Sequence, residues 1–167
     1  MHPPTGRLKL SVDGAFKNAA GSAGGGGILR DHQGTCMFAF ATKYQGAISA
    51  LDAEARALRD ELTTCCNQGI LDIMVETDST TLMQIITGQI PPPWELICII
   101  QEMAVTTKKL KAQIKHVPGE ANQVAHSLAG YGCYINQFRF WDSGAVLPHI
   151  VKGPYRLDKV GCPTLRP

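Results

Sequence analysis

Three carboxylates occupy positions from which a folded chain could bring them together. Asp13 and Asp78 each follow a stretch typical of a β-strand, and Glu54 lies near the start of a long helical pattern. If the two strands are neighbours, their ends place the aspartates side by side, and a helix packed over them adds Glu54. Crowded carboxylates repel one another, and oxygen-preferring Mg²⁺ or Mn²⁺ relieves that repulsion. Two such ions about 4 Å apart could activate water and stabilise the leaving oxygen of a phosphodiester.

Each of these residues also has an ordinary structural explanation. An Asp-Gly pair such as Asp13-Gly14 often forms a turn, and an Asp-Ser pair such as Asp78-Ser79 often caps a helix. A glutamate near a helix N-terminus is favoured by the helix dipole. The combination is more specific than any one member, and it makes the three carboxylates candidate metal ligands.

The elements that must position these residues follow from hydrophobic periodicity. Strands are predicted at 7–14, 18–31, 35–44, 70–78 and 111–117, and helices at 49–69, 79–89, 95–110 and 119–132. Ser49 and Asp52 resemble a capping box, and Gly69 is a plausible helix stop. This order predicts an α/β fold with a mixed five-stranded sheet, an antiparallel meander of three strands plus two parallel strands, and helices on both faces. We expect one domain over 1–132 and a C-terminal extension or tail over 133–167.

Composition narrows the class of protein. The chain has 167 residues, 44% hydrophobic and 18% charged, with a net charge of +2 that permits nucleic-acid contact without arguing for it. Its six cysteines show no zinc-binding spacing, which favours an intracellular, reducing compartment. No apolar run is long enough to span a membrane, so we expect no membrane partner. The start, seven residues before a core strand, predicts a domain of a longer protein.

Five segments in order from residue 8 to residue 130 carry a family resemblance: "LSVDGAF", "AGGGGILRDHQG", "SALDAEARAL", "VETDS" and "HVPGEANQVAHSLA". They resemble the plant ribonuclease H-like domain of the type-1 ribonuclease H family, whose relatives include domains associated with retrotransposon reverse transcriptases. The resemblance implies the ribonuclease H-like fold. It also implies two-metal hydrolysis of the RNA strand of an RNA–DNA hybrid, leaving 3′-OH and 5′-phosphate ends.

The resemblance also implies roles for individual residues. The first three metal-binding acids of the family fall on Asp13, Glu54 and Asp78, and His116 falls on a histidine used in substrate or product handling. The fourth acid position holds His126. Four positions are implied to contact substrate, near a minor groove where the 2′-OH distinguishes RNA from DNA: Gly14, Asn18, Ser79 and Asn122.

His126 leaves three interpretations open. The imidazole could fill space in an abandoned site, bind a metal (Mn²⁺, Zn²⁺ or Ni²⁺ more readily than Mg²⁺), or act nearby as a hydrogen-bonding or proton-transfer group. Asn122 precedes it by four residues, so the two share a helix face. We therefore expect a ribonuclease H-like endoribonuclease whose activity the histidine could weaken. The alternatives are a catalytically impaired nucleic-acid-binding domain, or a protein-interaction module that retains the fold.

Overall fold

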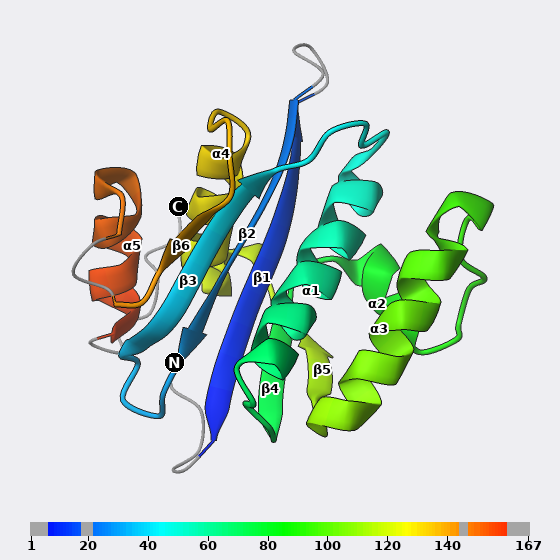
Figure 1. Ribbon diagram of the computed structural model, residues 1–167, viewed down its shortest axis with the longest axis horizontal. Helices are drawn as coiled ribbons and strands as arrows, with labels where there is room; N and C mark the ends of the chain where they lie inside the picture. The colour runs from blue at the N-terminus through cyan, green and yellow to red at the C-terminus, as the bar shows by residue number, and fades with distance from the viewer. Residues whose placement is uncertain (1–6, 18–21, 144–146, 160–167) are drawn as a thin grey trace.

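The computed structural model describes residues 7–17, 22–143 and 147–159 (Figure 1). The strands are β1 (Leu8–Lys17), β2 (Ser22–Arg30), β3 (Cys36–Lys43), β4 (Ile73–Thr77), β5 (Gln113–His116) and β6 (Arg139–Trp141). The α-helices are α1 (Ala50–Asn67), α2 (Thr80–Ile86), α3 (Ile97–Leu110), α4 (Gln123–Gly132) and α5 (His149–Lys159). Two short 3₁₀ turns, η2 (Trp94–Leu96) and η3 (Gly119–Ala121), precede α3 and α4.

One mixed sheet organises these elements, in the strand order β5-β4-β1-β2-β3-β6. The antiparallel meander of β1, β2 and β3 is confirmed, and β4 and β5 add in parallel beside β1. The prediction of five strands is wrong, because β6 pairs antiparallel with β3. β6 is only 3 residues long, too short for an alternating pattern to show in the sequence. Its segment is held by ring stacking, with Phe140 on Phe38 at 5.4 Å and Phe138 on Phe40 at 5.7 Å.

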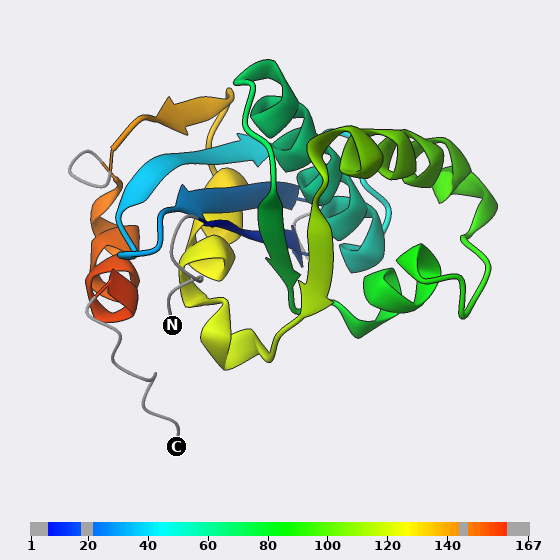
Figure 2. The ribbon, with the colours of Figure 1, turned by 90° about the horizontal axis from the view of Figure 1, so that it is seen from below.

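Helices cover both faces of the sheet, and a run of four glycines in β2 decides how closely they approach (Figures 1 and 2). At Gly24 and Gly26, an added Cβ atom would lie 2.6–2.7 Å from the backbone of α4 and the turn after it. At Gly25 it would lie 2.9 Å from the Cβ atom of Ala57 in α1, and at Gly27 it would collide with the Glu61 carboxylate of α1. Alternate residues of a strand face opposite sides, so the run lets one helix settle on each face.

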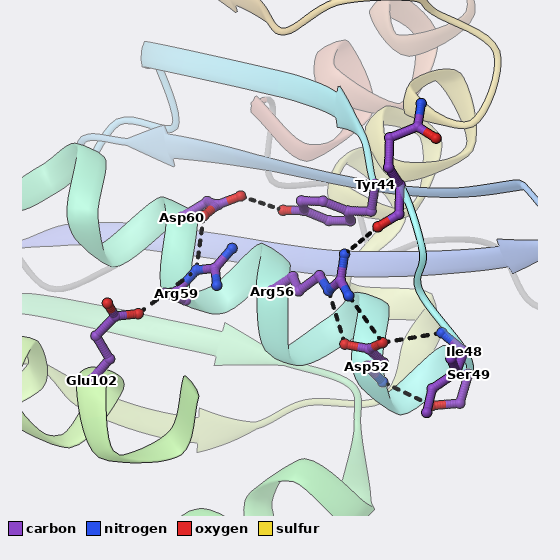
Figure 3. A network of polar contacts seen from close by, with 9 residues as sticks. Tyr44, Ile48, Ser49, Asp52, Arg56, Arg59, Asp60 and Glu102 are labelled. Atoms are coloured by element: carbon purple, nitrogen blue, oxygen red, sulfur yellow. Dashed lines mark hydrogen bonds and ion pairs between the residues drawn. The ribbon is translucent and has the colours of Figure 1, made fainter. Parts of the chain in front are cut away.

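The N-terminus of α1 is fixed by the capping that its sequence predicts (Figure 3). The Ser49 hydroxyl accepts a hydrogen bond from the Asp52 N–H at 3.0 Å, and Asp52 accepts one from the Ile48 N–H at 3.0 Å. Arg56 donates to Asp52 at 2.9 Å, one turn further on. The predicted stop is also confirmed, because Gly69 follows the helix with φ of +70°. These contacts set the register in which α1 presents its first turns to the sheet.

A second group of polar contacts joins α1 to its neighbours (Figure 3). The Tyr44 hydroxyl, just beyond β3, donates to Asp60 at 2.8 Å. Arg59 donates to the same carboxylate at 3.1 Å and lies 4.0 Å from Glu102 of α3. The middle of α1 is thereby tied to the end of β3 and to α3.

The described part of 133–167 contains β6 and α5, where the sequence shows little periodicity. Val151 and Tyr155 of α5 belong to the same apolar cluster as Leu128 of α4, and the Cys36 N–H donates to the Tyr155 hydroxyl at 2.9 Å. Pro154 lies inside α5 and masks the helix in the sequence, since proline usually ends one. None of the helices in the described ranges has the length and apolarity that crossing a bilayer requires.

One buried acid has no evident structural partner. Glu61 of α1 is fully buried, and within the described part of the chain neither of its carboxylate oxygens has a hydrogen-bond partner. Burial raises the pKa of Glu61 well above its usual 4.5, and the charge of Asp60 adds to this effect. The fold therefore favours the protonated form of Glu61.

We expect Glu61→Gln to stabilise the protein increasingly as the pH rises. Above pH 4.5 the unfolded chain releases the Glu61 proton while the folded chain retains it, so the wild type loses stability until the pH passes the raised pKa. The free-energy gap between variant and wild type should widen by about 1.4 kcal/mol per pH unit in that window. Urea unfolding between pH 5 and 8 measures this gap, with Glu95→Gln on the exposed surface as the control. A gap that does not change with pH would contradict the assignment.

Candidate metal and active site

The three predicted carboxylates converge at one end of the sheet. Asp13 lies in β1, Asp78 directly follows β4 and Glu54 lies in the first turns of α1. Each offers an oxygen, and these atoms all lie within 4.8 Å of one another. The parallel pairing of Val12 with Thr77 places the two aspartates side by side. The sequence-based expectation about how these three residues are arranged is therefore met.

Gly14 explains how α1 reaches this position. A Cβ atom there would lie 2.6 Å from the Glu54 Cα atom, so any side chain would push α1 away from β1. The Gly14 N–H also donates to Asp13 Oδ1 at 3.0 Å. This residue, predicted to contact substrate, thus contacts both the helix and the carboxylate.

Burial, together with the neighbouring carboxylates, raises the pKa of Glu54 and of Asp78. Burial raises the pKa of Glu54 to about 8, with further contributions from the charges of Asp13 and Asp78 and an opposing hydrogen bond to Ser79. Burial likewise raises the pKa of Asp78 to about 6, helped by Asp13 and opposed by His126. Three oxygen donors this close together fit a hard divalent cation, whose charge would offset their repulsion.

A nearby acid on the same strand shows a different arrangement. Glu76 of β4, two residues before Asp78, is buried between lysines, with Lys9 Nζ at 3.6 Å and Lys115 Nζ at 3.8 Å. A structural carboxylate in this sheet is therefore paired with cations. Asp13, by contrast, forms its ion pair with a histidine.

His126 of α4 is that histidine. Its Nδ1 atom lies 3.0 Å from Asp13 Oδ2, and its side chain is 70% exposed where Asp13 is 6% exposed. The hydrogen bond to Asp13 raises the pKa of His126 against the opposing effect of burial. Of the three interpretations, this geometry favours the hydrogen-bonding group. His126 is not among the described residues whose ligand atoms all lie within 4.8 Å of one another.

Asn122 and Ser79 are buried close to the carboxylates. The Asn122 side-chain amide donates to the Val12 carbonyl at 2.9 Å, which ties the start of α4 to β1 next to Asp13. The Ser79 hydroxyl caps α2 by accepting from the Leu82 N–H at 3.1 Å. Both positions were predicted to contact substrate. Here they connect the elements that carry the site.

His116 lies at the exposed end of β5, where it pairs with Thr77 of β4. Its Nε2 atom lies 3.2 Å from the Thr80 hydroxyl, at the start of α2. Thr80 is a contact that sequence reasoning missed, because a threonine at a helix start carries no signal of a distant partner. Asn18, also predicted to contact substrate, falls outside the described residues.

Comparison with known proteins identifies the fold and the family. The family model described as "Reverse transcriptase-like" matches residues 11–132, well over half of the chain. The chain belongs to the reverse transcriptase-like family. This ribonuclease H-like domain has the fold of type-1 ribonucleases H, as the solved structures similar to it show. No curated protein sequence matches it.

Three solved structures illustrate that similarity. Ribonuclease H1 from the halophilic archaeon Halobacterium salinarum is 25% identical with a TM-score of 0.63, and the match covers 76% of this chain and 97% of that one. LC11 ribonuclease H1, from compost and bound to an RNA/DNA hybrid, is 21% identical with a TM-score of 0.67, covering 75% and 96%. The N-terminal ribonuclease H domain of a Mycobacterium tuberculosis protein is 20% identical with a TM-score of 0.68, covering 76% and 93%.

We expect divalent metal to stabilise this ribonuclease H-like domain more at pH 8 than at pH 5. Without metal, stability falls as the pH rises through the raised pKa values of Asp78, about 6, and Glu54, about 8. A cation favours the ionised carboxylates, so saturating Mn²⁺ should raise Tm by about 5 °C or more at pH 8. Thermal unfolding measures this shift. Asp13→Asn should remove most of it, whereas Asp142→Asn, an exposed change of equal charge, should leave it intact.

Proposed function

We propose that this domain hydrolyses the RNA strand of RNA–DNA hybrids with Mg²⁺ or Mn²⁺. The observation that carries the proposal is the convergence of three carboxylate oxygens within 4.8 Å on a ribonuclease H-like fold. LC11 ribonuclease H1, which shares this fold, crystallised in complex with an RNA/DNA hybrid, and that complex supports a hybrid as the substrate.

The roles follow from the contacts of each residue. Asp13, Glu54 and Asp78 would hold the metal, and His126 lies beside them against Asp13. When bound, the cation would act as a Lewis acid on a phosphoryl oxygen and stabilise the charge of the leaving oxygen. His116, exposed beside α2, would assist substrate or product handling.

Two of the residues predicted to contact substrate have structural partners. Ser79 and Asn122 are buried and engaged, so we assign them to holding the carboxylates in place rather than touching substrate. Gly14 and Asn18 belong to the region that would approach the minor groove of the hybrid.

His126 supports a second candidate function, hybrid binding with little cleavage. A cationic imidazole next to Asp13 opposes a divalent ion, and a missing carboxylate charge at 4 Å is worth about 4 kcal/mol at an effective dielectric constant of 20. Metal binding would therefore compete with protonation of His126. We therefore expect weak metal affinity at neutral pH rather than a disrupted fold.

The direct test is cleavage of an end-labelled RNA–DNA hybrid in Mg²⁺ and, separately, in Mn²⁺. We expect cleavage that Asp13→Asn lowers by at least about a hundredfold, because it removes a metal ligand worth several kcal/mol. Circular dichroism and Asp142→Asn control for folding and charge. Hybrid binding without cleavage in either metal would replace the first function with the second. Absence of binding would overturn both and favour a protein-interaction module.

We expect His126→Asp to raise Mg²⁺-dependent cleavage by about tenfold or more, a gain of about 1.4 kcal/mol. The substitution removes an imidazole that can become charged and adds a carboxylate beside Asp13. A lower Mg²⁺ concentration for half-maximal rate should accompany the gain. Gln123→Asp adds the same charge at an exposed position in α4 and serves as the control. Equal rates and metal affinities in His126→Asp and wild type would rule out this role for the position.

A further inference from the structure

A cavity of about 210 Å³ lies at the edge of the sheet farthest from β6, between α2, α3 and β5. A Thr hydroxyl is the only side-chain polar group among its lining residues, which are Ile86, Ile100, Met103, Ala104, Thr107 and Ile114. An apolar cavity of roughly 150 Å³ is large enough to bind benzene. This one therefore has room for an aliphatic side chain. None of its lining residues belongs to the carboxylate site.

The strand beside the cavity has an open backbone edge. β5 is the outer strand of the sheet, and within the described ranges no strand pairs with its far side (Figure 2). The backbone N–H of Val117, directly after β5, points toward β4 and donates a hydrogen bond to the Thr77 carbonyl at 2.9 Å. Because peptide groups alternate along a strand, those of Ile114 and His116 face outward. Such an edge is a template for an added strand.

Cavity and edge meet at Ile114. Its side chain lines the cavity, while its peptide group faces the open side of β5. An added strand would lie about 4.8 Å away, and its side chain opposite Ile114 would point to the same face of the sheet. One extended segment can therefore bond the edge and fill the cavity together.

The rim of this site is basic. Lys108 lies in α3, four positions and so about one helical turn after the lining residue Ala104, and Lys111 is the C-cap residue of α3, four positions after the lining residue Thr107. No ion pair involves either lysine within the described residues. Lys115 of β5 is half-exposed and lies 3.8 Å from Glu76, on the face of the sheet opposite the Ile114 side chain. Lysines at an edge strand repel a second copy of the same edge, so the charges favour an acidic partner over self-association.

We propose that β5 and this cavity form a docking site for an acidic, extended peptide segment that carries one aliphatic residue. The segment adds a strand to β5, inserts its aliphatic side chain beside Ile114, and places its carboxylates near Lys108 and Lys111. Backbone pairing supplies affinity, while the cavity and the lysines select the sequence. The lysines alone would equally suit a nucleic-acid backbone, but an apolar cavity beside an open strand edge favours a peptide.

The test is fluorescence anisotropy of a labelled heptapeptide, EDVLVDE, with the full chain. We expect saturable binding that weakens at least about tenfold when serine replaces the central leucine. Ala104→Trp, which fills the cavity, should have an equal effect, whereas Val105→Trp on the outward face of α3 should not. Lys108→Glu should weaken binding, and Lys152→Glu on α5 should leave it unchanged. Hydrogen exchange at the Ile114 and His116 amides should slow when the peptide is bound.

Other outcomes would overturn the proposal. Absence of saturation up to about 1 mM peptide, the weak end of specific binding, would exclude the site. So would binding that Ala104→Trp does not affect. A single-stranded DNA oligonucleotide that binds in place of the peptide, and loses affinity only through Lys108→Glu, would assign the lysines to nucleic acid. Because none of these variants touches Asp13, Glu54 or Asp78, failure here is distinct from failure of hybrid cleavage.

Discussion

The close approach of two helices to β2 is the constraint on which the site depends. Four glycines in one strand leave no side chains to hold α1 and α4 away, so the helices settle against opposite faces of the same strand. Gly14 extends that approach to β1. Glu54 and His126 consequently lie close to Asp13 in β1 and to Asp78 just after β4. A residue type usually regarded as weakening a strand here sets the distances within a candidate catalytic centre.

Glu76 in β4 and Asp78 just after it have opposite electrostatic surroundings, one typical of a structural residue and the other typical of a functional site. Glu76 is compensated within the sheet by Lys9 and Lys115, whereas Asp78 faces other carboxylates at the end of the strand. Burial, and then the charges of the neighbouring carboxylates, raise the pKa of Asp78 and of Glu54. Such an arrangement costs stability, and it is typical of sites that bind a cation or handle protons. His126 offsets part of this cost from the other face of the sheet.

Local signals in the sequence were enough to predict most of the fold and the positions of the three acids. Capping by Ser49, the stop at Gly69 and the position of Asp78 just after β4 are properties of short segments, and the structure has each of them. The predicted end of the first strand at Asp13-Gly14 is wrong, because β1 continues to Lys17 and Asp13 pairs with Gly26 of β2. Contacts between distant segments were not predictable in the same way. The bond between His126 and Asp13 joins residues 113 positions apart. β6 is stabilised by ring stacking rather than by a pattern of its own, and Pro154 conceals α5.

The pairing of His126 with Asp13 also has a consequence for how this site can evolve. The His126 side chain is mostly exposed, so its replacement disturbs no packed core. Histidine and aspartate codons differ by a single base. A chain with a cation at this position and one with a fourth carboxylate are therefore neighbours in sequence space, separated by one nucleotide change on an unchanged scaffold.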